Sequence, residues 1–115
     1  MNILFNKNIL LGITGSIAAY KAADITSKLK KEGCNIKIVM TKSSESFVTE
    51  TTLESLSSNP VFTEEDKDGL VTKFTHLDLA KWADILLVAP CTANFMNKLA
   101  HGHGDDFLST ICLAY

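Results

Sequence analysis

The pattern of hydrophobic and polar positions divides the chain into short apolar runs and longer stretches with a helical period. Residues 8–13 form an apolar run that ends in small residues, which is typical of a strand buried in a parallel sheet. The stretch that follows places apolar and charged residues on opposite faces of a helix. Its apolar positions are Ala18, Ala22, Ile25 and Leu29, and its charged positions are Lys21, Asp24, Lys28 and Lys31.

Gly33 predicts the end of this helix, and residues 36–40 form a second apolar run. Strand, glycine turn, helix and strand in this order make a βαβ unit. Such a unit implies a right-handed crossover and two parallel strands.

The middle of the chain predicts one more helix and one short strand. The helix covers residues 45–58, and Asn59 with Pro60 ends it. Its apolar contacts would be Phe47, Leu53 and Leu56. Residues 61–62 would open a short strand, and the acidic, polar stretch 63–72 predicts an exposed loop.

The last third of the chain contains three helix starts around one further strand. Residues 85–89 form that strand, which Pro90 ends. The predicted N-caps are Thr75, with Asp78 in a variant of the capping box, then Thr92, and then Asp105 or Asp106. The helices would run through Leu77, Leu79 and Trp82, over residues 93–100 as far as Gly102, and through Leu108, Ile111 and Cys112.

This alternation predicts an α/β protein with a Rossmann-like fold, in which helices cover both faces of a parallel sheet. The chain stops at Tyr115, directly after a predicted helix, where a doubly wound sheet would continue with a strand. We therefore expect residues 1–115 to be one domain that lacks its C-terminal strands.

Composition narrows the class of protein without identifying it. The 115 residues suffice for one small domain, and 46% hydrophobic with 21% charged residues is ordinary for a globular protein. A net charge of −2 gives no reason to expect binding to nucleic acid or to an anionic membrane. The apolar run near Leu10 is too short for a membrane span and lacks the arrangement of a signal peptide. Cys34, Cys91 and Cys112 form neither a disulfide framework nor a zinc motif, so we expect a cytoplasmic protein.

Two turns could hold an anion or a flat ring. In residues 12–18, small residues at a strand-to-helix turn expose N–H groups at a helix start, which favours phosphate. Residues 40–44 offer hydroxyls and Lys42 where a dinucleotide enzyme would place an acid, which favours a mononucleotide. A plain βα turn and a solvated, capped loop would explain the same residues. Phe47 could face a flat ring or belong to the core.

Two further features could carry chemistry. His76 begins a short helix, where a neutral imidazole could act as a base or hydrogen-bond partner; a surface histidine is the alternative. Residues 89–94 follow a core strand at the edge where open α/β proteins bind ligands, and a capped helix start is the alternative there. For His101, His103 and the aspartates after them, the spacing favours a structural turn over a metal site.

Taken together, these segments resemble the homo-oligomeric flavin-containing cysteine decarboxylase family. Four stretches carry the resemblance. They are GITGSIAAYK at 12–21; VMT at 39–41 with Ser44 and FV at 47–48; HLDLA at 76–80 with WAD at 82–84; and APCTAN at 89–94 with KLA at 98–100. Each motif is weak alone, but their order and spacing are highly specific. The resemblance covers residues 9–115 and implies a Rossmann-like flavoprotein fold, bound FMN and a homotrimer or higher homo-oligomer.

The resemblance also implies residue roles and a reaction. His76 matches the active-site histidine of the family. The positions that match the family's FMN contacts are Gly15, Ser16, Thr41, Ser44, Phe47, Cys91, Thr92, Ala93 and Asn94. Flavin would oxidise the cysteine side chain of the substrate to a thioaldehyde, carbon dioxide would leave, and the enethiol would be reduced. The match is greatest to members that act on phosphopantothenoylcysteine in coenzyme A biosynthesis, a small-molecule substrate.

Several alternatives stay open on the sequence alone. A second signature of the family, Pro-x-Met-Asn-x-x-Met-Trp, would lie beyond Tyr115, so we expect this chain to lack part of the active site. Within the family, a peptidyl-cysteine decarboxylase or a flavin prenyltransferase is possible, although residues 19–21 favour the coenzyme A enzyme. From another class, the chain could be a non-catalytic FMN-binding subunit that needs a second polypeptide.

Overall fold

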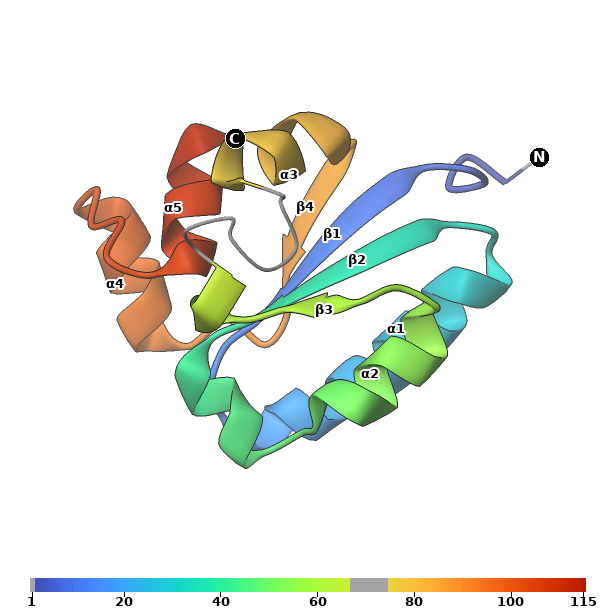
Figure 1. Ribbon diagram of the computed structural model, residues 1–115, viewed down its shortest axis with the longest axis horizontal. Coiled ribbons are helices and arrows are strands. Elements are labelled where there is room, and N and C mark those ends of the chain that lie inside the picture. The colour runs from blue at the N-terminus through green and yellow to red at the C-terminus, as the bar shows by residue number, and fades with distance from the viewer. Residues whose placement is uncertain (1, 67–74) are drawn as a thin grey trace.

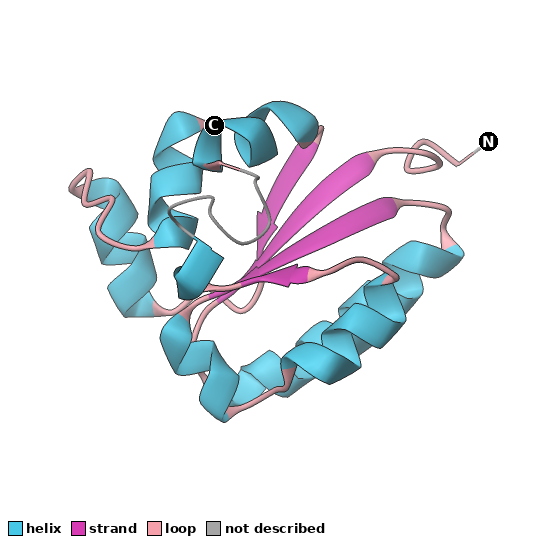
Figure 2. Cartoon of the chain, in the orientation of Figure 1, coloured by secondary structure: helices cyan, strands magenta, loops and turns pink. Residues whose placement is uncertain are grey.

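The computed structural model describes residues 2–66 and 75–115. Within them, the chain forms a parallel four-stranded sheet in the order β3-β2-β1-β4. The strands are β1 (Asn8–Ile13), β2 (Asn35–Met40), β3 (Val61–Phe62) and β4 (Ile85–Val88). Helices lie on both faces of this sheet, which confirms the predicted α/β architecture (Figures 1 and 2).

The helices divide into two groups, one for each face. The α-helices are α1 (Ala22–Lys31), α2 (Glu50–Ser57), α3 (His76–Trp82), α4 (Ala93–Ala100) and α5 (Phe107–Ala114). Short 3-10 turns are η1 (Ile17–Lys21), η2 (Lys42–Ser46) and η3 (Glu64–Asp66). Helices α1 and α2 cover one face, and α3, α4 and α5 cover the other (Figure 1).

Alternate residues of β1 supply both halves of the core. Ile9 and Leu11 pack on the side of α1 and α2, whereas Leu10 packs against α3, α4 and α5. Side chains of a strand alternate between faces, so a strand covered on both faces must be apolar throughout. Gly12 has a special place here, because a Cβ at this position would lie 2.6 Å from the Leu108 side chain. Helix α5 therefore rests directly on the backbone of β1.

Most predicted helix boundaries are confirmed by their caps. Thr75 accepts a hydrogen bond from the Asp78 N–H in a reciprocal capping box, and Thr92 accepts one from the Phe95 N–H. Asp106, not Asp105, caps α5. At the end of α1, Gly33 has φ +84°, a conformation that a residue without Cβ adopts at little cost.

The prediction of one continuous helix over residues 45–58 is wrong. The chain forms the turn η2 first, and α2 begins only after Thr49, whose hydroxyl accepts a hydrogen bond from the Thr52 N–H. The Ser44 hydroxyl donates to the Thr41 carbonyl at 2.7 Å, which favours the tight turn over a continuous helix. Phe47 consequently lies between the two elements and is 45% exposed.

The prediction of an exposed loop over residues 63–72 is wrong for its first part. Thr63 and Asp66 are buried, because Asp66 Oδ2 accepts a hydrogen bond of 2.7 Å from the Thr63 N–H across η3. Residues 67–72 lie outside the described part of the chain. In the part that the structure describes, no helix has the length and apolar character needed to cross a membrane.

Candidate functional site

The strand order creates a switch point at one end of the sheet. From β1 the chain moves outward through β2 to β3, and then it returns to place β4 on the other side of β1. The loops that follow β1 and β4 therefore diverge, and open α/β proteins bind ligands in the crevice between such loops. We call the loops after β1, β2 and β4 the carboxyl edge.

Gly15 brings the first two of these loops into close contact. A Cβ at Gly15 would lie 2.9 Å from the carbonyl carbon of Ser43, a distance that real Cβ atoms do not tolerate. Any larger residue would push the loop after β1 away from the loop after β2. The glycine that the sequence marked as a tight turn is thus needed for contact between loops, and Ser43 is a neighbour that sequence reasoning missed.

Thr14 joins the loop after β1 to the loop after β4. Its hydroxyl donates to the Pro90 carbonyl at 2.6 Å and accepts from the Thr92 N–H at 3.0 Å. The side chain is 2% exposed, so both bonds are shielded from water. Sequence reasoning treated Thr14 only as part of a turn. The available signal was a polar residue that directly follows an apolar strand.

Ser16 and Thr92 each begin a helical segment at this edge. The Ser16 hydroxyl accepts a hydrogen bond from the Ala18 N–H at 3.1 Å, and Thr92 caps α4. Among residues 2–66 and 75–115, no acceptor is recorded for the backbone N–H groups of Gly15, Ile17, Ala93 and Asn94. These N–H groups lie in the turn before η1, at the start of η1 and at the start of α4, where positive dipole ends favour an anion.

The loop after β2 adds hydroxyl groups, most of which serve the protein itself. Thr41 Oγ1 donates to the Ile13 carbonyl at 3.2 Å and lies 3.3 Å from Ser43 Oγ. Ser44 is fully buried, and its hydroxyl is engaged with the Thr41 carbonyl. Phe47 is the exposed aromatic ring of this loop. The structure therefore places Thr41, Ser44 and Phe47 on one loop, together with the exposed residue Ser43.

The loop after β4 contains Cys91, which is half-buried beside α5. Burial raises the pKa of the Cys91 thiol. It also raises the pKa of Cys112 to about 11, and the Asp106 carboxylate and Cys91 add to that effect. Both thiols therefore stay protonated at neutral pH, which makes Cys91 a poor nucleophile. Its role at this edge is to lead into Thr92, Ala93 and Asn94.

His76 lies apart from the other predicted site residues. It is the first residue of α3, the helix that packs on α5 and leads into the amino end of β4 (Figure 1). In the described part of the chain, no hydrogen bond or ion pair joins His76 to the carboxyl edge. Within one chain, the structure thus brings the predicted cofactor residues to one edge and leaves the predicted catalytic residue elsewhere.

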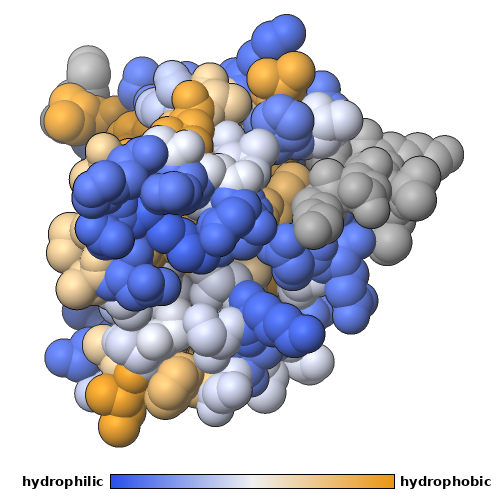
Figure 3. All heavy atoms as spheres, turned by 90° about the vertical axis from the view of Figure 1, so that its left-hand side faces the viewer, coloured by the Kyte–Doolittle hydropathy of each residue, from blue (hydrophilic) through white to orange (hydrophobic). Residues whose placement is uncertain are grey.

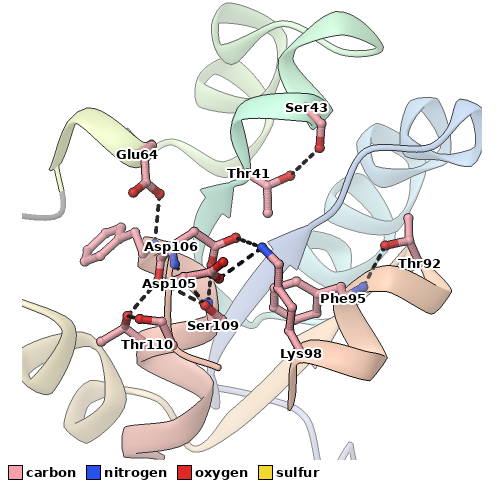
Figure 4. A network of polar contacts seen from close by, with 12 residues as sticks. Thr41, Ser43, Glu64, Thr92, Phe95, Lys98, Asp105, Asp106, Ser109 and Thr110 are labelled. Atoms are coloured by element: carbon pink, nitrogen blue, oxygen red, sulfur yellow. Dashed lines mark hydrogen bonds and ion pairs between the residues drawn. The ribbon is translucent and has the colours of Figure 1, made fainter. Parts of the chain in front are cut away.

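Several charged side chains next to the carboxyl edge have polar partners within the chain. Lys98 Nζ lies 3.1 Å from Asp105 Oδ1 and 3.3 Å from Asp106 Oδ2, and its side chain points toward the start of α5 (Figure 4). The hydrogen bond to Asp105 raises the pKa of Lys98, and the same bond lowers the pKa of Asp105. Glu64 Oε2 accepts a hydrogen bond from the Phe107 N–H at 2.8 Å. This network fastens α5 to α4 and to the loop after β3.

Three of the residues weighed for a metal site, His101, Asp105 and Asp106, make polar contacts in the same region. His101 Nδ1 lies 2.9 Å from the Asn97 carbonyl oxygen, and the aspartates contact Lys98. Among the described residues, no group of three or more histidine, cysteine and carboxylate side chains is placed to hold an ion.

The face that carries α4 and α5 is largely hydrophilic at its centre, with apolar side chains at its margins (Figure 3).

A separate small cavity beside η2 does not suit a phosphate group. Its lining residues are Lys42, Glu45, Glu64 and Glu65. Three carboxylates around one ammonium group repel an anion. This cavity is therefore not a candidate for binding an anion.

Comparison with known proteins yields one family and several relatives. A family model described as Flavoprotein matches residues 3–115. The coenzyme A biosynthesis bifunctional protein CoaBC of Bacillus subtilis (strain 168) is 46% identical over 97% of this chain and 28% of its own length. The probable phosphopantothenoylcysteine decarboxylase of Streptococcus mutans is 43% identical over 94% of this chain and 60% of its own length. The chain thus spans less than two thirds of these relatives.

Solved structures agree with the fold. A crystal structure described as the FMN-dependent cysteine decarboxylase SpaF has a TM-score of 0.84 at 31% identity, covering 96% of this chain and 64% of that one. A mutant PPC decarboxylase complexed with pantothenoylaminoethenethiol has a TM-score of 0.78 at 31% identity, covering 96% and 61%.

Proposed function

Because the chain belongs to the Flavoprotein family, we propose that it binds FMN at the carboxyl edge and contributes to the decarboxylation of phosphopantothenoylcysteine. The relatives named for this reaction and the FMN-dependent neighbours support the proposal. The observation that carries it is the set of N–H groups without acceptors around Gly15 and at the start of α4.

The residues at this edge fit a mononucleotide flavin. Gly15 and Ser16, with the N–H of Ile17, would hold the phosphate, since small residues and free donors let it approach the backbone. Ala93 and Asn94 would donate to the polar edge of the ring, and Thr92 orients them as the cap of α4. Thr41, Ser44, Phe47 and Cys91 would line the site, with Ser44 acting through the shape of its turn.

The reaction needs an electron sink and a base. FMN, when bound, supplies the oxidation of the cysteine side chain that makes loss of carbon dioxide favourable. The substrate thiol must lose its proton as its carbon–sulfur bond becomes double, and we assign that proton to His76. General bases of this kind contribute roughly 10² to 10⁴ in rate.

The separation of His76 from the carboxyl edge within one chain favours a site shared between copies. We propose a homotrimer or higher homo-oligomer in which α3 of one copy faces the FMN of another. In this arrangement the histidine completes a site that a single chain leaves open. We place this activity in the cytoplasm, where its three free cysteines would stay reduced.

One experiment tests binding and catalysis separately. FMN is titrated into the purified protein and flavin absorbance is recorded, and then carbon dioxide release from phosphopantothenoylcysteine is measured for wild type and His76→Asn. We expect both proteins to bind FMN equally and the variant to lose about 10³-fold in turnover. Normal turnover by the variant would refute the role of His76, and a colourless protein indifferent to FMN would refute the binding site. Protein that binds FMN but turns over only with a second polypeptide would identify a non-catalytic subunit.

A further inference from the structure

The Thr14 hydroxyl occupies an unusual position for a polar group. It follows β1 at the centre of the sheet and is almost fully buried, yet both of its hydrogen-bond partners belong to a loop 76 to 78 residues away in sequence. We call these two bonds, to the Pro90 carbonyl and from the Thr92 N–H, the Thr14 bridge. A valine of the same shape would fill the same space without either bond.

The bridge joins the residue after β1 to the residue at which α4 begins. Thr92 is the N-cap of α4, and its own N–H donates to Thr14 while its hydroxyl accepts from Phe95. The backbone of Thr92 is therefore held from both sides. The free N–H groups of Ala93 and Asn94 follow directly, so their direction depends on the orientation of Thr92. Gly15 comes directly after Thr14, so the same residue also fixes the start of the other donor loop.

We propose that Thr14 is a positioning residue, whose buried hydroxyl holds the donor groups of the two loops at the separation that FMN requires. The inference rests on the proposed function, because it concerns the same cofactor site. Thr14 does not need to touch FMN for this role. It acts by preorganising the loops after β1 and β4, which otherwise would have to be ordered when the ligand binds.

The test compares three variants in the assembled protein. Thr14→Val deletes the hydroxyl, and Thr14→Ser restores it. Thr26→Val is the matched control, since Thr26 is also fully buried and its hydroxyl donates to the Ala22 carbonyl at 2.8 Å, inside α1. FMN affinity is measured by flavin fluorescence well below the unfolding temperature of each apoprotein. Hydrogen–deuterium exchange gives the rate at which the Thr92 amide proton is replaced.

We expect Thr14→Val to bind FMN about tenfold more weakly and to exchange the Thr92 amide faster, with both effects reversed in Thr14→Ser. Thr26→Val should lower the unfolding temperature while leaving FMN affinity and Thr92 exchange unchanged. Wild-type affinity in Thr14→Val, or equal loss in Thr26→Val, would overturn the positioning role alone. Failure of the wild-type protein to bind FMN would instead overturn the proposed function and this inference together.

Discussion

The two ends of the sheet use polar groups in opposite ways. At the amino edge, where β1, β2 and β4 begin, Asn8 and Asp84 exchange hydrogen bonds: the Asn8 N–H donates to Asp84 Oδ2 at 2.9 Å, and the Asp84 N–H donates to the Asn8 carbonyl at 2.8 Å. The Asn8 side chain also donates to the Trp82 carbonyl and accepts from Asn35. At this end, backbone groups of Asn8, Trp82 and Asp84 are thus engaged in hydrogen bonds within the chain.

At the carboxyl edge, several backbone N–H groups of the described residues have no acceptor. Thr14 and Thr41 satisfy the backbone between the loops, and Thr92 caps α4, but the N–H groups of Gly15 and Asn94 have no recorded acceptor among the described residues. The strands are the same, so strand sequence alone does not distinguish the two ends. The two edges thus differ in their backbone N–H groups without acceptors, and such groups favour an anion.

The largest expected effect comes from placing a side chain at Gly15, where the loops after β1 and β2 are in close contact. Gly15→Val would force the loop after β1 away from Ser43, because even a Cβ there meets the Ser43 backbone at 2.9 Å. We expect FMN affinity to fall about 100-fold, as the donor groups move apart. Flavin absorbance after gel filtration measures the bound fraction.

Gly104→Ala is the control for this change. A Cβ at Gly104 would lie 3.1 Å from the end of the flexible Leu113 side chain and at the ordinary contact distances of 3.5 and 3.6 Å from Thr110, and neither residue belongs to a donor loop. It should retain FMN as wild type does. If Gly15→Val also retained FMN, contact between these loops would not matter for the cofactor.

A smaller effect on FMN affinity should distinguish the carboxyl edge from the amino edge. Thr92→Ala removes the cap of α4 at the carboxyl edge, and Asn8→Ala removes a side chain bonded at the amino edge. Each should lower the free energy of unfolding by about 1 kcal/mol. Only Thr92→Ala should weaken FMN binding, by about fivefold, because only this cap orients donors toward the ligand.

Urea unfolding and FMN titration on the same two samples measure both quantities. Equal FMN affinity in the two variants would mean that loss of stability, and not the edge concerned, controls binding. A weaker FMN affinity in Asn8→Ala would show that the amino edge is coupled to the site.

The smallest expected effect is on the stability of the fold at acidic pH. Hydrogen bonds from the Thr75 backbone and side chain hold the pKa of Asp78 below its usual value. A carboxylate whose pKa is lower in the folded protein stabilises it above the unfolded pKa, and this contribution disappears as pH falls through the folded pKa. Asp78→Asn keeps an acceptor for the cap but cannot titrate. Its unfolding free energy should therefore depend less on pH between about 5 and 2 than that of wild type.

Thermal unfolding across this pH range tests the assignment. Identical pH dependence in wild type and Asp78→Asn would show that the capping carboxylate contributes nothing to acid sensitivity.

Local patterns in the sequence determined the elements and most of their boundaries. Apolar runs predicted the strands, and Thr75, Thr92 and Gly33 predicted helix starts and a stop, because caps and glycine act over only a few residues. The prediction of one helix over residues 45–58 was wrong because Ser44 and Thr49 form short-range hydrogen bonds that compete with a continuous helix. The pattern of apolar residues does not reveal such bonds. The motifs predicted which loops carry the cofactor residues, without showing how those loops meet.

Only the tertiary structure decided which loops lie together. The contact of Gly15 with Ser43 and the bonds of Thr14 to residues 90 and 92 join segments far apart in sequence, so no local pattern encodes them. The position of His76 away from that edge follows from the packing of α3 on α5, and no local sequence pattern predicted it. Sequence thus determined which groups the chain carries and where its elements begin, whereas strand order and close packing decided which donors were left without acceptors.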